Sequence, residues 1–167
     1  MTQPLPANIS SKPTPSARLN SGVRPRAMQS TPSSILEEGR TILAPFLEPF
    51  GFSWRTGASG SGSGGPFASG SYVRGDRRLE VHFRYSLGLV TYHLRDESIS
   101  HQDFVRIAAS RTVRSQYPGF SDDPLDGFRH LAHDLDVICS SFVEDSETGF
   151  QEVLVLSKSA SSRPRLP

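Results

Sequence analysis

Residues 67–94 have the sequence FASGSYVRGDRRLEVHFRYSLGLVTYHL, in which two turn signals separate three runs of alternating apolar and polar side chains. The dipeptide Gly75-Asp76 is typical of a two-residue β-hairpin, because glycine readily adopts the positive φ that this turn requires. Side chains alternate between the two faces of a strand, so counting outward from the turn predicts which residues face one another. The apolar pairs are Tyr72 with Leu79, Gly70 with Val81 and Ala68 with Phe83.

The interleaved positions of the same hairpin predict a polar face. Its pairs are Val73 with Arg78, Ser71 with Glu80, Ser69 with His82 and Phe67 with Arg84. A second reversal at Ser86-Leu87 would pair Phe83 with Val90, Val81 with Tyr92 and Leu79 with Leu94, and it would put His93 opposite Glu80. A slip of one residue would mix the two faces, so the alternation favours this register.

Before these strands, the sequence predicts a helix, a short strand and a loop. Ser34 and Glu37 form a capping box, and apolar residues follow at helical spacing until the prolines at 45 and 49. A short strand is expected near residues 52–55. The glycine- and serine-rich residues 57–66 predict a flexible loop between strands, because they have neither the lysine nor the following helix of a phosphate-binding loop.

After the strands, two helices are expected to cover one face of the sheet. Ser100 caps the first, which is predicted to run to about Ser115. Asp123 and Pro124 open the second. Its apolar face contains Leu125, Phe128, Leu131, Ala132, Leu135, Ile138 and Phe142. Residues 150–156 fit a helix or a buried strand equally well. The fold class is therefore α+β: an N-terminal helix, an antiparallel β-meander of about four strands and two C-terminal helices packed on one sheet face.

Composition divides the 167 residues into one domain and two tails. Residues 1–33 have four cations and no acidic residue, and residues 157–167 have three cations, so both are predicted to be disordered basic tails. Translation could start at Met1 or at Met28. The single domain, residues 34–156, has eleven arginines and seventeen acidic residues, a net charge of −6. An acidic domain argues against a nucleic-acid partner.

The remaining features favour a cytoplasmic protein without a membrane partner. No apolar run has the eighteen residues of a membrane span, and the N-terminus has no apolar signal-peptide core. The one cysteine, Cys139, lies on an apolar helix stripe and is predicted to be a small core residue. No cofactor is expected, and the oligomeric state stays open.

The polar sheet face is the predicted site for a partner protein. Its candidate residues are Arg78, Glu80, His82, Arg84 and His93. Two imidazoles and one carboxylate can also bind zinc or a similar metal, so Glu80, His82 and His93 are alternative metal ligands. An outward sheet face ordinarily collects mixed polar residues, which favours the partner surface over the metal site.

Three further groups favour a structural interpretation. Ser69 with His82 could be a nucleophile and base, but Glu80 is expected to lie about 7 Å along the strand, too far to orient the imidazole. His130, His133 and Asp134 are typical of a solvated helix face with a His–Asp pair. Arg74-Gly75-Asp76 matches an adhesion tripeptide, but here it forms the hairpin turn.

Two resemblances can be stated from these residues. The blocks 64–70, 77–88 and 117–120, with sequences GGPFASG, RRLEVHFRYSLG and YPGF, look like those of small uncharacterised bacterial proteins of a domain of unknown function. This resemblance covers roughly residues 34–145 and implies no activity. The order of helix, meander and helices, with the acidic charge, is similar to that of immunity-type proteins that block a toxin.

The sequence thus favours a small protein-binding module, which could be immunity-like or antitoxin-like, and is more consistent with a non-enzyme than with an enzyme. One alternative is a metal-binding protein or enzyme that uses Glu80, His82 and His93. Another is an acidic protein similar to secretion chaperones. Neither the identity of a partner nor that of a substrate can be inferred from the residues.

Overall fold

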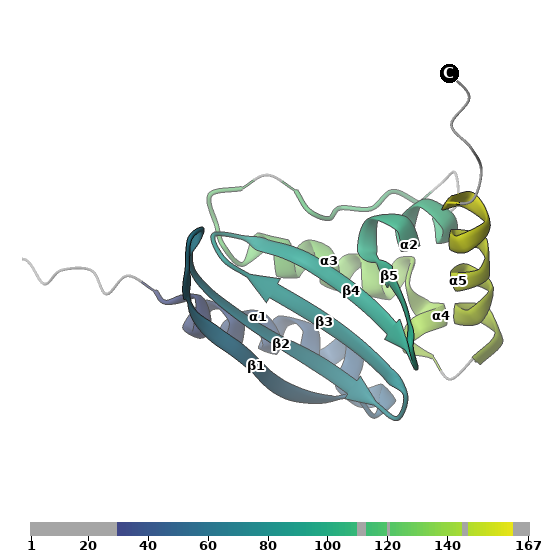
Figure 1. Cartoon of the computed structure of the whole chain (residues 1–167), viewed down its shortest axis with the longest axis horizontal. Helices are drawn as coiled ribbons and strands as arrows, with labels where there is room; N and C mark the ends of the chain where they lie inside the picture. The colour runs from purple at the N-terminus through teal and green to yellow at the C-terminus, as the bar shows by residue number, and fades with distance from the viewer. Residues whose placement is uncertain (1–29, 110–112, 120, 145–146, 162–167) are drawn as a thin grey trace, which may run out of the picture.

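The computed structural model describes residues 30–109, 113–119, 121–144 and 147–161. Within these ranges, five antiparallel strands form one sheet in the order β1-β2-β3-β4-β5. Each strand therefore lies beside the strand that precedes it in the sequence, which makes the sheet a meander (Figure 1). The strands are β1 (Ser53–Gly62), β2 (Gly65–Arg74), β3 (Arg77–Phe83), β4 (Leu87–Leu94) and β5 (Glu97–Ser100).

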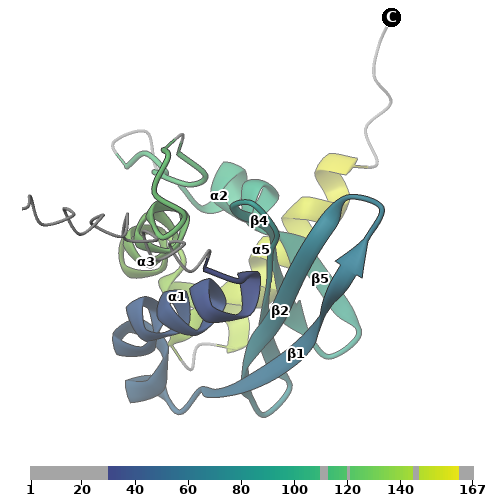
Figure 2. The ribbon, with the colours of Figure 1, turned by 90° about the vertical axis from the view of Figure 1, so that its left-hand side faces the viewer.

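Helices cover one face of this sheet and leave the other face open, as Figure 2 shows from the side. α1 (Pro32–Leu47) and α3 (Asp126–Val137) lie behind the sheet, while α2 (His101–Ala108) and α5 (Glu147–Ser161) lie together near β5. The short helices η1 (Glu48–Phe50) and α4 (Ser140–Val143) complete the described elements. The α+β class with an antiparallel sheet is confirmed. The details differ, because the described sheet has five strands and four helices follow it.

The core lies between the sheet and the helices. α1 contributes Leu36, Leu43 and Leu47, and the phenyl ring of Phe128 on α3 stacks on Phe83 of β3 with 6.0 Å between the ring centroids. α1 and α3 meet at Gly39, where an added Cβ would lie 2.5 Å from the Phe128 ring. The glycine is therefore what permits the two helices to approach each other.

The first hairpin has the register that alternation predicts. All seven pairs from Ala68 with Phe83 to Arg74 with Arg77 are present, and the turn glycine, Gly75, has φ +56°. Arg84 follows the end of β3, and its guanidinium lies 5.9 Å from the ring centroid of Phe67, its predicted partner.

The second hairpin differs from the prediction by two residues along most of β3 and by three at Phe83. Phe83 pairs with Leu87, Val81 with Val90 and Leu79 with Tyr92, so Glu80 faces Thr91, and His93 faces Arg78. The reversal uses residues 84–86, and an irregularity between Val81 and Phe83 adds a residue to β4. Leu87 becomes a buried core residue in this arrangement. A shift of two residues preserves the faces, which explains why the predicted inside and outside remain valid.

The predicted flexible loop at residues 57–66 is wrong. β1 runs through Gly62 and β2 starts at Gly65, so most of the glycine- and serine-rich segment is paired strand. The pairing register shifts between Thr56 and Ser59. Backbone hydrogen bonds form a strand without large side chains, and this is the reason why composition alone misassigned the segment.

The helix boundaries also differ from the sequence prediction. α1 begins with Thr31 as its N-cap, whose hydroxyl accepts the Ser34 N–H, and it continues through Pro45 to Leu47. The Ser100 cap of α2 is confirmed, but α2 ends at Ala108. α3 begins at Asp126, and its backbone N–H bonds to Asp123 O in the preceding turn.

At the C-terminal end, α5 resolves the ambiguity at residues 150–156 as a helix, and it extends beyond the predicted domain boundary through Ser161. Cys139 is buried, as predicted. In the described part of the chain, no helix is long and apolar enough to cross a membrane. Residues 1–29 and 162–167, which include most of both predicted tails, lie outside the described residues.

Candidate functional site

The open face of the sheet brings four of the five predicted site residues into one polar cluster. Glu80 lies at its centre on β3. Its Oε1 is 2.8 Å from His82 Nε2, and its Oε2 is 3.2 Å from His93 Nε2 and 3.5 Å from Arg78 Nη2. His93 reaches Glu80 diagonally, because the register places it opposite Arg78.

The expectation that Glu80 lies too far from His82 is wrong. The two residues project from the same face of β3, and their long side chains bend toward each other to form the 2.8 Å hydrogen bond. The distance between Cβ atoms two positions apart on a strand therefore does not predict the distance between the polar ends of two long side chains.

Charge compensation dominates this cluster. Burial alone would raise the pKa of Glu80, but the hydrogen bond from His82 and the charges of Arg78 and His93 outweigh it and hold that pKa below its usual value. Partial burial and the neighbouring Arg78 lower the pKa of His93, against the opposing effect of Glu80. The carboxylate is thus ionised at neutral pH and is already occupied by its three neighbours.

These contacts make the cluster a poor match to a metal centre. Nε2 of both His82 and His93 lies against the Glu80 carboxylate. Across the described ranges, no group of three or more His, Cys, Asp or Glu residues is arranged to hold a metal ion. The geometry is that of an ion-paired surface.

The Ser69 hydroxyl also has a hydrogen-bond partner of its own. It is largely buried and donates to the Ala58 carbonyl at 3.0 Å, whereas His82 bonds to Glu80. A serine nucleophile needs its base within hydrogen-bond reach. The observed contacts therefore tie β2 to β1 and do not make a nucleophile and base.

Arg84 belongs to a different part of the open face. It lies in a hollow of about 320 Å³ next to the polar cluster, and His82 lines the same hollow. The other walls include Phe67, Tyr85 and Leu89. Tyr85 and Leu89 are 73% and 69% exposed, and the Tyr85 hydroxyl donates to the Gly64 carbonyl at 3.1 Å. Phe67 was predicted opposite Arg84 on this face, whereas Tyr85 and Leu89 were not among the predicted site residues.

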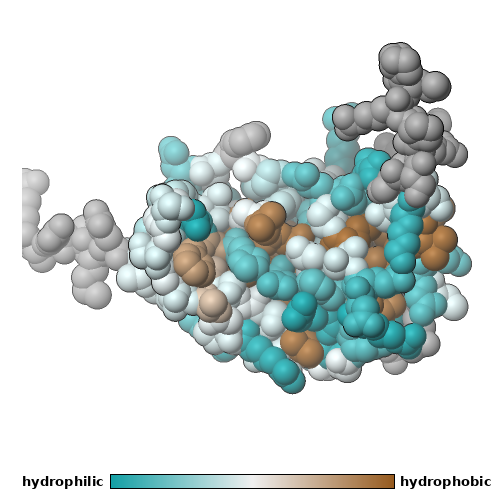
Figure 3. All heavy atoms as spheres, in the orientation of Figure 1, coloured by the Kyte–Doolittle hydropathy of each residue, from teal (hydrophilic) through white to brown (hydrophobic). Residues whose placement is uncertain are grey.

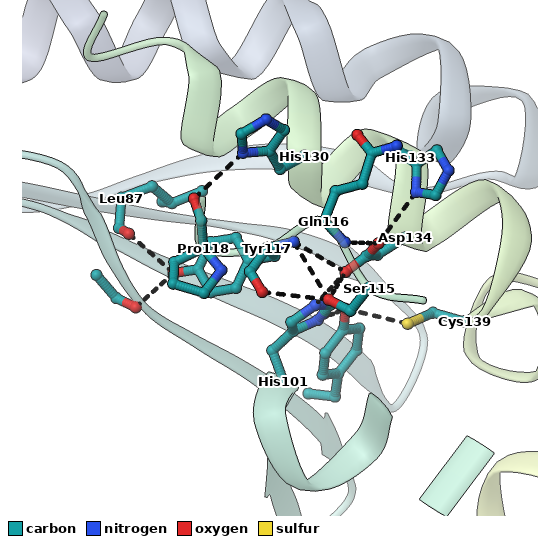
Figure 4. A network of polar contacts seen from close by, with 12 residues as sticks. Leu87, His101, Ser115, Gln116, Tyr117, Pro118, His130, His133, Asp134 and Cys139 are labelled. Carbon is teal, nitrogen blue, oxygen red and sulfur yellow. Dashed lines mark hydrogen bonds and ion pairs between the residues drawn. The ribbon is translucent and has the colours of Figure 1, made fainter. Parts of the chain in front are cut away.

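A second polar group, shown in Figure 4, lies inside the molecule. Asp134 is fully buried, so the predicted solvated helix face is wrong at this residue. Its carboxylate accepts hydrogen bonds from His101 Nε2 at 3.0 Å, the Ser115 hydroxyl, the Gln116 N–H at 3.0 Å and His133 Nδ1 at 3.1 Å. His130 instead contacts the Pro118 carbonyl. Sequence reasoning missed His101, which lies 33 residues from Asp134.

This buried group is not arranged as a catalytic triad. In a triad, the imidazole lies between the serine and the carboxylate. Here Ser115 and His101 both donate to the same Asp134 carboxylate, and His101 Nδ1 lies 2.8 Å from the Tyr92 hydroxyl. Burial raises the pKa of Cys139, 3.5 Å from that hydroxyl, to about 12, so its thiol stays protonated. The group connects α2, α3 and residues 115–117.

The Arg74-Gly75-Asp76 turn also has a structural role. The Arg74 guanidinium donates to the Phe50 carbonyl at 2.8 Å and to the Val143 carbonyl at 2.9 Å. Arg77 is buried beside it and donates to the Phe142 carbonyl at 2.7 Å. Cationic side chains suit the exposed carbonyls at a helix C-terminus. The two arginines therefore fasten the hairpin to the end of α4.

Comparisons of the chain with protein-family models, with curated proteins and with solved structures each find no match.

Proposed function

We propose that this protein is a binding module whose open sheet face recognises another protein. The observation that carries the proposal is the hollow beside the polar cluster, because it combines aromatic, arginine and exposed aliphatic side chains on a face that no described helix covers. Tyrosine and arginine in such hollows often dominate binding between proteins. Inhibition of a toxin, as by immunity-type proteins, is one form of such binding and stays a prediction.

The surface view supports this choice of face. Figure 3 shows the open side as mainly hydrophilic, with separate apolar patches. This mixture of a polar rim and local apolar anchors is typical of partners that associate and dissociate. The four side chains of the polar cluster hold one another in place. Binding therefore loses less side-chain conformational entropy than it would with free side chains.

Alanine substitution on this face tests the proposal. The variants replace, one at a time, Arg78, Glu80, His82, Arg84 and His93. Because exposed ion pairs contribute about 0–1 kcal/mol to folding, we expect each melting temperature to stay close to that of the wild type. A partner isolated from an extract of the native host and identified by mass spectrometry should be recovered less by these variants.

Arg40→Ala on α1 is the matched control, because Arg40 is an exposed, ion-paired arginine in the helical layer. It should recover the partner as the wild type does. Equal recovery by the wild type and all five variants would contradict the proposal.

A further inference from the structure

β1 forms a long edge of the sheet. β1 is ten residues long, β2 is its one partner among the described strands, and most of its residues are exposed. β5, at the other edge, is four residues long and has α5 against it. Proteins commonly protect a long edge strand with lysine, proline or an inward charge. β1 has none of these, Arg55 is its one charged residue, and its register irregularity lies between Thr56 and Ser59, before Gly60.

Two glycines of β1, Gly60 and Gly62, lie between this edge and the hollow on the open face. Gly60 pairs with Phe67, and an added Cβ at Gly60 would lie 3.5 Å from the Phe67 ring. Near Gly62, an added Cβ would meet no atom within 4 Å. A glycine within a strand often marks the close approach of another backbone. A side chain from a strand beside β1 could therefore cross the bare glycines and reach Phe67 and Arg84.

The charge on the open face indicates which side chains would suit that path. Arg55, Arg78 and Arg84 occupy open-face positions, and Glu80 is the one carboxylate at such a position on the described strands. Glu80 already has three cationic or imidazole neighbours. The face is thus locally positive on a domain whose net charge is −6. Complementary charge favours a carboxylate-rich partner.

We propose that β1 binds an extended acidic segment of a partner protein as a sixth strand, with carboxylates directed over Gly60 and Gly62 toward Arg84. This inference rests on the proposed binding function. It specifies the edge of the sheet that the partner binds and the acidic character of the partner segment. Addition of a strand to a free edge supplies affinity through main-chain hydrogen bonds, while side chains supply selectivity.

Synthetic peptides test the edge and the charge separately. The probe is a fluorescein-labelled ten-residue peptide of alternating threonine and glutamate, measured by fluorescence anisotropy at low salt. We expect it to bind at least about tenfold more tightly than the threonine–lysine peptide. The same acidic peptide with every amide N-methylated should bind at least about tenfold more weakly, because it cannot donate to β1. Hydrogen exchange of the β1 amides should slow when the acidic peptide is bound.

Charge reversal on the protein provides the matched comparison. Arg84→Glu should weaken binding of the acidic peptide by at least about fivefold, whereas Arg40→Glu on α1 should change that binding little.

Equal binding of the N-methylated peptide, with unchanged hydrogen exchange of the β1 amides, would overturn the strand addition and leave face binding intact. Equal binding of the lysine peptide would overturn the acidic partner. No binding of any peptide at millimolar concentration would overturn the inference without affecting the partner-recovery test. A dimer with β1 amides protected in the absence of peptide would assign the edge to a second copy instead.

Discussion

Asp134 is the residue whose ionisation is most closely linked to the fold. Burial would raise the pKa of its carboxyl, but hydrogen bonds from His101, Ser115, the Gln116 backbone and His133 hold that pKa well below its ordinary value of 3.8. In the unfolded chain the carboxyl recovers the ordinary value. Its contribution to stability is therefore fully present above about pH 4 and is lost as the pH falls further.

Asp134→Asn should lower the free energy of unfolding by at least about 2 kcal/mol at neutral pH, because it replaces the ionised acceptor of several buried hydrogen bonds, which contribute about 1.5–3 kcal/mol each when one partner is charged. Between about pH 4 and pH 2, the stability of the variant should fall less steeply than that of the wild type, because the variant lacks this proton uptake. Urea unfolding at several pH values measures both effects.

The control is His133→Ala, which removes a half-buried donor and leaves the donors from His101, Ser115 and residues 116–117 in place. It should cost about 1 kcal/mol and keep the acid slope. If Asp134→Asn retained the full slope, other carboxyls would account for the acid sensitivity.

At the scale of elements, the packing of α1 on α3 depends on Gly39. Gly39→Ala should destabilise the protein, because displacing the buried Phe128 ring costs up to about 3 kcal/mol, which exceeds the gain in helix propensity of about 1 kcal/mol. The loss should shrink in a Phe128→Leu background. A double-mutant cycle from chemical unfolding measures that coupling.

Gly62→Ala is the matched glycine control, since an added Cβ there meets no neighbour. Its effect on stability should be small. If Gly39→Ala were as well tolerated in the wild type as Gly62→Ala, the close approach of the two helices would not be a constraint.

The elements also show what alternation can and cannot predict. The Gly75-Asp76 hairpin was predictable pair by pair, because a two-residue turn leaves one register that separates the faces. The next hairpin shifted by two residues at Val81 and Leu79 and kept their faces, since neither the reversal at residues 84–86 nor the added residue in β4 has a signal in the apolar pattern. β1 was missed beyond residue 55 for another reason. Backbone hydrogen bonds form this strand, and its glycine and serine side chains give no apolar alternation from which a strand could be predicted.

The candidate site divides in the same way. Arg78, Glu80, His82 and His93 were predicted to share a face, and they do, although Glu80 does not lie opposite His93. Phe67, His82 and Arg84 were predicted on that face as well, but the turn residue Tyr85, which lines the same hollow, was not. The Asp134 group depends on contacts between segments far apart in the chain, which periodicity within one helix cannot reveal.

For the whole molecule, the two sheet faces should respond differently to the loss of an aliphatic side chain. Leu131 is fully buried beneath the sheet, and Leu89 is largely exposed on the open face. Leu131→Ala should lower the free energy of unfolding by about 2–5 kcal/mol through the cavity it leaves. Leu89→Ala should change stability little but weaken partner binding. Thermal unfolding and partner recovery measure the two effects, and a large stability loss in Leu89→Ala would mean that the open face is covered.

The contact of Gly39 with Phe128 has a consequence for the order in which the protein is made. During synthesis α1 leaves the ribosome before the sheet, but Phe128, whose ring packs against Gly39, follows about ninety residues later. The meander can assemble strand by strand as it emerges, because each strand pairs with its predecessor. α1 can rest on β2 during that interval, yet its docking is completed only when α3 arrives. The nascent chain therefore carries a partly exposed apolar helix for most of its translation, and this is the period in which a chaperone would find it.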